Sequence, residues 1–350
     1  MKTQTFVGSE GRAAVRVEGQ PQLSDTEWCW IDIQLDEPSR DPSFEEELRA
    51  IDLDSMAVSD AFNEIDLPKL DDFDDHLLVV LHGIADEAEA TLEIDCFVTT
   101  QHIVTIRRHV SPALEEFARQ IQRRPELSSG GPSEMLARMA DVVLRRFLHV
   151  MDDLDDRVDE LTDMGLAADP DFLEELTVVR RYVGDLRHVL RPQRNVLDQL
   201  RRSSSELVTD GGRRRFSDVF DVANRSVQEL EGVRAALSET LGAYRGAEAR
   251  KATEVTKVLT IYAAVVLPLS LIAGVFGMNF VTIPGADNPN GWWILVGSMV
   301  ALAAMSLVLF GIAGWIRLPR IRTGIASRVW IPERARRAVE LSDAVFEPTD

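Results

Sequence analysis

The stretch that decides the fold runs from Lys257 to Phe280 and reads KVLTIYAAVVLPLSLIAGVFGMNF. No charged residue follows Lys257 until Asp287, and none follows Asp287 until Arg317. Each uncharged span is long enough to cross ~30 Å of hydrocarbon as a helix, and a short polar loop joins the two spans. The sequence therefore predicts a protein that crosses a membrane twice.

The first span carries a stripe of mostly small or polar side chains on one helical face. Steps of three and four residues connect its members, which are Thr253, Thr256, Thr260, Ala263, Leu267, Ser270, Gly274 and Gly277. We count Leu259 with the same set of expected pore-lining residues. Close helix packing also uses small residues and is the alternative. Because one helix hairpin cannot enclose a pore, a pore lined by this stripe requires several copies around a symmetry axis.

Charge placement predicts the orientation of the two spans. The loop between them has no Lys or Arg, whereas basic residues flank both outer ends, namely Arg250, Lys251, Lys257, Arg317, Arg320 and Arg322. By the positive-inside rule, both ends of the chain are expected in the cytoplasm. The first residues lack the apolar core of a signal peptide. We therefore expect a multi-pass protein of the cell membrane whose soluble part is cytoplasmic.

The composition excludes several classes of function. The 350 residues carry a formal net charge of −20, and between Asp41 and Asp95 18 acidic residues face only two basic ones. Such a surface repels nucleic acid and attracts cations. The sequence has no phosphate-binding glycine loop and no nucleophile with a recognisable base. We expect no enzyme, no ATP-driven pump and no organic cofactor.

The N-terminal part reads as a mixed α/β domain. Four apolar or alternating runs suit strands, namely Trp28–Ile33, Leu77–Leu81, Thr91–Thr99 and His102–Ile106. The acidic segment from Phe44 to Ala61 has helical spacing. Cys29 and Cys96 lie in strand-like contexts without metal-ligand spacing, which predicts buried free thiols in a reducing compartment.

Three long helices are expected next. Ser133 is the expected N-cap of a helix to about Gly165, and a second helix should run from Asp169 to about Leu207 with a kink at Pro192. From Arg213 an amphipathic pattern continues without proline to Pro268, which predicts one helix of about 60 residues, roughly 90 Å long. Helices of this length need partners along their apolar face.

An acidic run follows in the first of these helices. Asp152 to Glu160, with Asp163, crowds like charges within a few turns. Hydrated cations or the C-terminal arginines would relieve the repulsion. A solvated helix tip is the alternative.

Gly277-Met278-Asn279, at the outer end of the first span, resembles the signature of the CorA family of divalent-cation transporters. The preceding Lys257-Val-Leu-Thr and Leu267-Pro-Leu-Ser-Leu-Ile-Ala-Gly, and the final helix, are also similar to this family. The resemblance extends less specifically to the N-terminal part. It implies an α+β membrane protein with a cytoplasmic α/β domain, a long helical stalk and two transmembrane helices, assembled as a homopentameric funnel in the lipid bilayer.

The resemblance also implies where metal ions bind. Gly277, Met278 and Asn279 would form the outer selectivity filter, where Asn279 carbonyls can hold hydrated Mg²⁺. The alternative is a helix cap, since Gly and Asn both end helices. Asp218 matches the family's aspartate at a regulatory metal site between subunits, with Glu64 or Asp66 as its partner. A solvated helix face is the other interpretation.

The sequence departs from the magnesium branch after the motif. That branch continues with an acidic loop of the Met-Pro-Glu kind, whereas this chain reads FVTIPGADNPNGW from Phe280. This loop looks more like the zinc-transporting ZntB branch. No Cys or His lines the stripe, although hydrated Zn²⁺ would not need them. We expect Mg²⁺ as the transported and regulatory ion, with Co²⁺ or Ni²⁺ also possible, and proton-coupled Zn²⁺ transport as the alternative.

The expected organisation has four parts. They are a cytoplasmic α/β domain (1–130), stalk helices (131–256), two transmembrane helices with the Gly-Met-Asn loop (257–318) and a basic cytoplasmic tail (319–350). Two other classes are weighed against a transporter. A membrane anchor would make the polar stripe incidental, and a membrane-tailed hydrolase would need a catalytic constellation that the sequence does not display.

Overall fold

The computed structural model describes residues 2–19, 21–35, 53, 58, 61, 66–85, 91–278 and 289–315. The chain divides into two compact units, Met1–Ala249 and Arg250–Asp350, and each is considered by itself. Glu64, Asn279, most of the segment expected to be helical between Phe44 and Ala61, and the C-terminal tail lie outside the described residues.

The first unit contains a seven-stranded mixed sheet. Its spatial order is β2-β1-β3-β7-β6-β5-β4. The strands are β1 (Lys2–Ser9), β2 (Arg12–Val17), β3 (Glu27–Gln34), β4 (Leu70–Asp72), β5 (Leu77–Ile84), β6 (Thr91–Val98) and β7 (His102–Arg107). All neighbours pair antiparallel except β3 and β7, which are parallel. The four predicted strands are confirmed, and β1, β2 and β4 are additional.

Alternating side chains give the sheet two buried faces. Trp30, Val79 and Ile94 belong to the larger core, which the sheet shares with the helices. Cys29 and Phe97 belong to a smaller core on the opposite face. Both cysteines are buried free thiols, as predicted.

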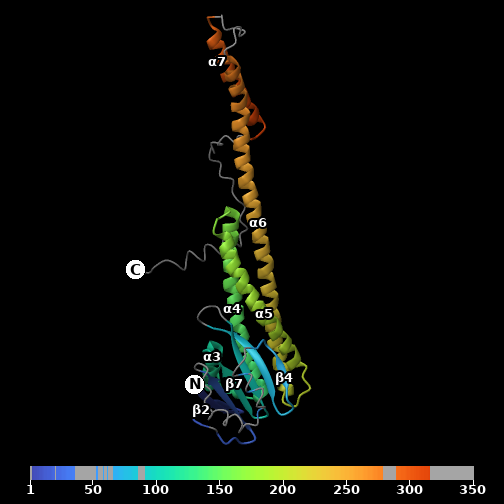
Figure 1. The fold of residues 1–350 in the computed structure, drawn as a ribbon. Coiled ribbons are helices and arrows are strands. Elements are labelled where there is room, and N and C mark those ends of the chain that lie inside the picture. Colours follow the sequence, from blue (N-terminus) through green and yellow to red (C-terminus); the bar gives the residue numbers. More distant parts are fainter. Residues whose placement is uncertain are drawn as a thin grey trace, which may run out of the picture. The chain divides into compact units, whose positions relative to one another are not determined.

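The helices of the first unit are long and cover the larger core (Figure 1). They are α3 (Pro112–Arg123), the short 3₁₀ turn η1 (Pro125–Ser128), α4 (Pro132–Ala167), α5 (Phe172–Arg201) and α6 (Asp210–Phe276). α5 runs through Pro192 without ending, as predicted, but it ends at Arg201 rather than near Leu207.

The predicted N-cap of α4 is wrong. The helix begins at Pro132, so the capping residue is Gly131 and Ser133 lies inside the first turn. Glu134 performs the capping because its Oε2 accepts a hydrogen bond from the Gly131 N–H at 3.0 Å. Proline at the first helical position needs no N–H partner, which favours this earlier start.

α4, α5 and the part of α6 within the first unit share one buried apolar strip. α4 and α6 meet where the Thr162 and Thr240 hydroxyls lie 3.1 Å apart. α5 and α6 meet where the Phe172 and Tyr244 rings stack with centroids 4.6 Å apart. These three helices therefore form one packed layer.

Two helices are long and apolar enough to cross a membrane by length and composition. They are α6, whose apolar part follows Lys257, and α7 (Gly291–Ile312). α6 has 67 residues and passes Pro268 without ending. The predicted long uninterrupted helix and the two C-terminal apolar spans are confirmed.

Candidate ion pathway and acidic sites

The expected pore-lining stripe lies on one continuous helix. The eight residues from Thr253 to Gly274 named for it belong to α6, and all except the half-buried Ala263 are exposed in the single chain. A helical segment with polar groups on one face can line a water-filled path only if that face is turned away from lipid. The described chain leaves this face available to other copies.

Two threonines of the stripe are oriented by their own helix. The Thr256 hydroxyl donates to the Ala252 carbonyl at 2.9 Å, and the Thr260 hydroxyl donates to the Thr256 carbonyl at 2.8 Å. Each hydroxyl proton is therefore used within α6, while the oxygen lone pairs remain acceptors. Such oxygens can face the water shell of a cation without adding charge to the membrane segment.

The end of α6 places the first part of the Gly-Met-Asn motif. The Gly277 N–H donates to the Ala273 carbonyl at 2.9 Å, a bond of the α-helical kind, and the Met278 N–H then donates to the Val275 carbonyl at 3.4 Å as the chain bends. Gly277 is not among the described glycines with positive φ, so a left-handed cap does not explain this glycine. A Cβ there would lie 3.0 Å from the Ala273 carbonyl oxygen, so tight backbone packing favours glycine.

Asp66 lies in a charged and hydrogen-bonded setting before β4. Its carboxylate contacts the Lys69 ammonium at 2.6 Å, and both side chains are about one-third exposed. Its N–H donates to Glu93 Oε1 at 2.7 Å, and its carbonyl accepts from His82 Nε2 at 2.7 Å. A metal ion that bound Asp66 would therefore compete with Lys69.

Two further carboxylates, those of Glu93 and Asp95, lie on β6 close to Asp66. Burial, together with the neighbouring Glu93 charge, raises the pKa of Asp95 to about 8. Burial also raises the pKa of Glu93, although the Asp66 N–H and Arg108 oppose this shift. The described residues contain no group of three or more His, Cys, Asp or Glu side chains arranged to hold a metal ion.

Asp218 is exposed on α6, directly before the buried Val219 and two residues after the buried Phe216. No contact in the described part of the chain joins its carboxylate to Asp66. The structure thus does not bring the two expected regulatory carboxylates together within one copy. Any metal bridge between them would have to join two copies.

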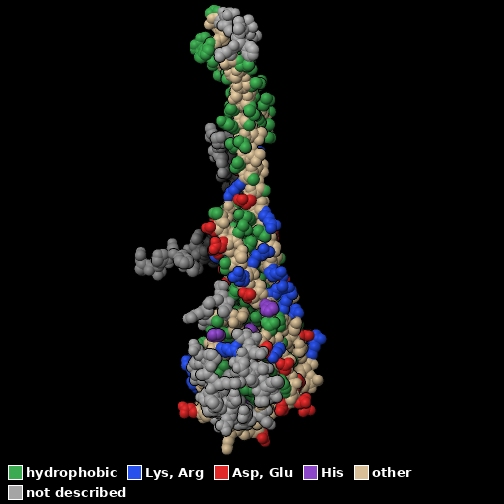
Figure 2. All heavy atoms as spheres, in the orientation of Figure 1, with side chains coloured by type: hydrophobic (Ala, Val, Ile, Leu, Met, Phe, Trp, Pro, Cys, Tyr) green, Lys and Arg blue, Asp and Glu red, His purple; other side chains and the backbone are tan. Residues whose placement is uncertain are grey.

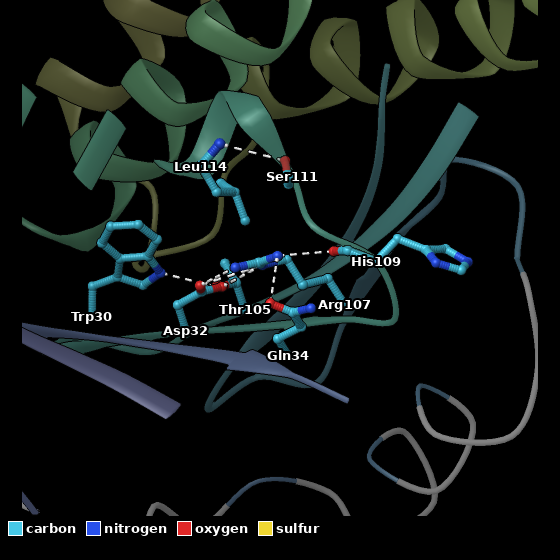
Figure 3. Close-up of polar contacts among 8 residues, drawn as sticks. All are labelled: Trp30, Asp32, Gln34, Thr105, Arg107, His109, Ser111 and Leu114. Atoms are coloured by element: carbon cyan, nitrogen blue, oxygen red, sulfur yellow. Dashed lines mark hydrogen bonds and ion pairs between the residues drawn. The ribbon is translucent and has the colours of Figure 1, made fainter. Parts of the chain in front are cut away.

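A buried ion pair joins the two halves of the sheet (Figure 3). Arg107 on β7 contacts Asp32 on β3 at 2.9 Å, and their side chains are only 1% and 5% exposed. Thr105 donates to Asp32 at 2.8 Å and accepts from the Trp30 indole at 3.0 Å. Because every charge in this group is paired, it is a structural junction rather than an open binding site.

Sequence reasoning missed the partners of the site residues. Lys69 was counted as one of two basic residues in an acidic segment, but its pairing with Asp66 was not predicted. The two residues are only three positions apart in an extended segment before β4, and no regular pattern in the sequence indicates that their side chains meet. No sequence signal predicted that Glu93, which lies on β6, would contact Asp66.

The uncharged part of α6 after Lys257, the apolar α7 helix, the polar stripe and the separate α/β unit are features expected of a membrane transport protein. Residues 25–314 match the family described as CorA-like Mg²⁺ transporter protein. Since this match covers most of the chain, the protein belongs to the CorA family of divalent-cation transporters.

Individual relatives come from two branches of this family. The cobalt/magnesium transport protein CorA of Methanocaldococcus jannaschii is 23% identical over 301 residues, covering 84% of this chain and 93% of the relative. The zinc transport protein ZntB of Pectobacterium atrosepticum is 22% identical over 316 residues, covering 88% of this chain and 92% of the relative.

The fold comparison agrees with the family match. The solved structure of the CorA magnesium transporter from Methanocaldococcus jannaschii superposes with a TM-score of 0.78 at 20% identity. The superposition covers 89% of this chain and 98% of the solved one. At this identity the likeness establishes the fold alone.

Proposed function

We propose that this protein conducts Mg²⁺ across the cell membrane through a homo-oligomeric pore whose outer filter is Gly277-Met278-Asn279. The observation that carries the proposal is the orientation of Thr256 and Thr260, whose hydroxyl protons are directed to their own helix. Their oxygens then present acceptors at successive turns of α6, at the start of its uncharged part. Repeated around a symmetry axis, such rings suit a hydrated divalent ion.

The assembly, orientation and domain limits belong to the same proposal. Five copies are proposed by resemblance to the family, with both ends of each chain in the cytoplasm. The four-part division at residues 130, 256 and 318 is proposed with it. In this arrangement the ion gradient and the membrane potential drive flow, because each unit charge moved through 100 mV changes the free energy by ~2.3 kcal/mol.

Zn²⁺ transport of the ZntB kind is the second candidate. The specific observation in its favour is the loop from Phe280, which lacks the acidic Met-Pro-Glu continuation. The similarity to a zinc transport protein over 88% of the chain supports it equally. A proton gradient would be coupled to the ion in this candidate.

Metal uptake by the purified chain in proteoliposomes tests both candidates. Mg²⁺, Co²⁺, Ni²⁺ and Zn²⁺ are supplied separately, with and without a pH gradient across the vesicles. Mg²⁺ flux that is independent of the pH gradient supports the first candidate, and Zn²⁺ flux that the gradient accelerates supports the second. Vesicles that stay impermeable to all four ions contradict transport and favour a membrane anchor.

We also propose that cytoplasmic metal regulates the pore by bridging Asp218 of one copy to Asp66 or Glu64 of the next. Two facing carboxylates repel when empty and attract through a bound divalent ion, so metal favours the arrangement that holds them together. The Lys69 contact at 2.6 Å gives Asp66 an alternative partner in the absence of metal.

A further inference from the structure

The three-helix layer carries opposite charges on its two edges. An acidic edge consists of Asp152, Asp155, Asp156 and Asp159 on α4 with Glu229 on α6. A basic edge consists of Arg187 and Arg191 on α5 with Arg234 on α6, grouped around Glu231. Figure 2 shows acidic and basic side chains gathered on different sides of these helices.

The acidic edge is under-compensated within one chain. Asp155 is exposed, yet partial desolvation and the charges of Glu229, Asp152, Asp159 and Asp156 all raise its pKa. Arg225 is a nearby cation, and it is already paired with Glu229 at 2.8 Å. Like charges at this spacing destabilise a helix surface, so the edge favours an external cationic partner.

The basic edge has the opposite imbalance. Three guanidinium groups share the single Glu231 carboxylate, from Arg187 at 3.1 Å, Arg191 at 2.6 Å and Arg234 at 3.0 Å. The cluster therefore keeps a net positive charge. Arg187, Arg191 and Arg234 are 35–47% exposed and can reach a second surface.

The two edges lie at the same level along α6. Glu229 belongs to one edge and Glu231 to the other, and they flank the buried Leu230. Two residues apart on a helix means a rotation of ~200° and a rise of only ~3 Å. The acidic edge thus lies along the groove between α4 and α6. The basic edge lies along the groove between α5 and α6, on the other side of α6.

We propose that the acidic edge of one copy docks against the basic edge of the next copy of this chain. The interface is heterologous, because each copy uses a different surface toward each neighbour. Since the two surfaces share one level along α6, repeated docking adds rotation with little rise and closes into a ring rather than a filament. This inference rests on the proposed homo-oligomeric pore and specifies which surfaces of the cytoplasmic helices form it.

The charges set partner register more than they add affinity. Exposed ion pairs contribute ~0–1 kcal/mol each and are screened by salt, whereas like charges brought together suppress wrong pairings. Apolar contacts elsewhere would supply most of the free energy of association, and the charged edges would determine which surfaces pair.

Crosslinking of the full-length chain tests the pairing. Asp155→Cys and Arg191→Cys are made in separate chains with different tags, and the native Cys29 and Cys96 are buried and give little background. Co-purified variants treated with a short bismaleimide should form a mixed dimer at least about tenfold more than either variant alone, because the interface is heterologous. One chain carrying both cysteines should form a ladder of higher oligomers.

Charge reversal supplies the second measurement. Arg187→Glu with Arg191→Glu, or Asp152→Arg with Asp155→Arg, should each reduce the oligomer fraction in native mass spectrometry. All four changes together should restore it, because the charges are exchanged. An unmodified chain that is monomeric would overturn the proposed pore itself. An oligomer that forms no mixed crosslink and ignores both reversals would overturn only this inference.

Discussion

Thr209 donates its hydroxyl to Glu134 Oε1 at 2.6 Å and so ties the start of α6 to the start of α4. The same Thr209 oxygen accepts the Gly212 N–H at 2.9 Å, capping the first turn of α6. Glu134 in turn accepts the Gly131 N–H at the start of α4. One carboxylate therefore orders two helix N-termini.

Removal of this hydroxyl should destabilise the unit that contains the sheet and the helices packed on it. Thr209→Ala loses a helix cap worth about 1 kcal/mol and leaves Glu134 with one partner fewer. We expect the apparent melting temperature of the full-length protein to fall by a few degrees in circular dichroism. Thr177→Ala is the matched control because its hydroxyl bonds only to its own helix at Leu173. Equal melting temperatures for both variants would contradict the tie.

The buried Asp95 should make stability fall as the pH rises. Burial and the Glu93 charge raise the pKa of Asp95 from 3.8 to about 8. Between these values the unfolded chain has lost this proton and the folded chain retains it, so rising pH favours unfolding. The stabilisation is complete below 3.8 and has been lost above about 8.

Asp95→Asn should flatten this part of the pH profile. The free energy of unfolding of the full-length protein is measured between pH 5 and about 8. As the pH rises, the variant should gain stability relative to the parent, and each unit of pKa shift corresponds to ~1.4 kcal/mol. Asp25→Asn, at an exposed position, should leave the profile unchanged. If the stability of the parent protein rises with pH over this range and that of Asp95→Asn rises in parallel, Asp95 is not a buried carboxyl that stays protonated in the folded state.

Thr256 should face the aqueous path. A cysteine placed there should react with soluble thiol reagents in reconstituted protein and the modification should block ion flux. Val265→Cys is the control because nine residues place it about 180° away around the helix, on the side expected to contact lipid. Equal labelling of both positions would show that the polar stripe does not face water.

Asn279 should be required for flux but not for assembly. Asn279→Ala removes a side-chain carbonyl from the proposed filter and little packing volume, so ion uptake should fall strongly at equal membrane abundance. Asn288→Ala changes the same residue type nine positions later in the loop and should retain uptake. Parental uptake by Asn279→Ala would exclude the filter role.

Metal protection against proteolysis should respond in opposite directions to two substitutions. Asp218→Ala should raise the Mg²⁺ concentration needed for protection, because one carboxylate of the bridge is lost. Lys69→Ala should lower it, because Asp66 loses its competing cation at 2.6 Å. Glu239→Ala removes a charge elsewhere on α6 and should have no effect. Superimposable titrations for all three variants would leave Asp218 a solvated residue.

Long periodic patterns made much of the fold predictable. The apolar run after Lys257 and the strip through Val227, Leu230 and Val233 repeat over many turns, so the long α6 and the C-terminal α7 were found from the sequence. The strands β1 and β2 were missed because Lys2–Ser9 and Arg12–Val17 lie near the sheet edge, where polar side chains dilute the pattern.

The charged sites were less predictable because their partners are distant in sequence. Arg187 and Arg191 reach Glu231 across 44 and 40 residues, and only the packing of α5 on α6 determines that distance. Ser133 was mistaken for the cap of α4 because its side chain type is favoured there, whereas Glu134 supplies the bond to Gly131 from inside the helix. Asp218 and Asp66 were named from the family, and their pairing between copies stays a prediction.

The parallel pairing of β3 with β7 also bears on how the chain folds during synthesis. Asp32 and Arg107 are 75 residues apart, so β1, β2 and β3 leave the ribosome well before β7, and until then the β3 edge that β7 covers in the final sheet stays open. Asp32 lies on that strand. Any strand that added there without a guanidinium at the matching place would bury an unneutralised carboxylate, at a cost of several kcal/mol. The ion pair thus protects the nascent sheet against a wrong partner until the right strand has been made.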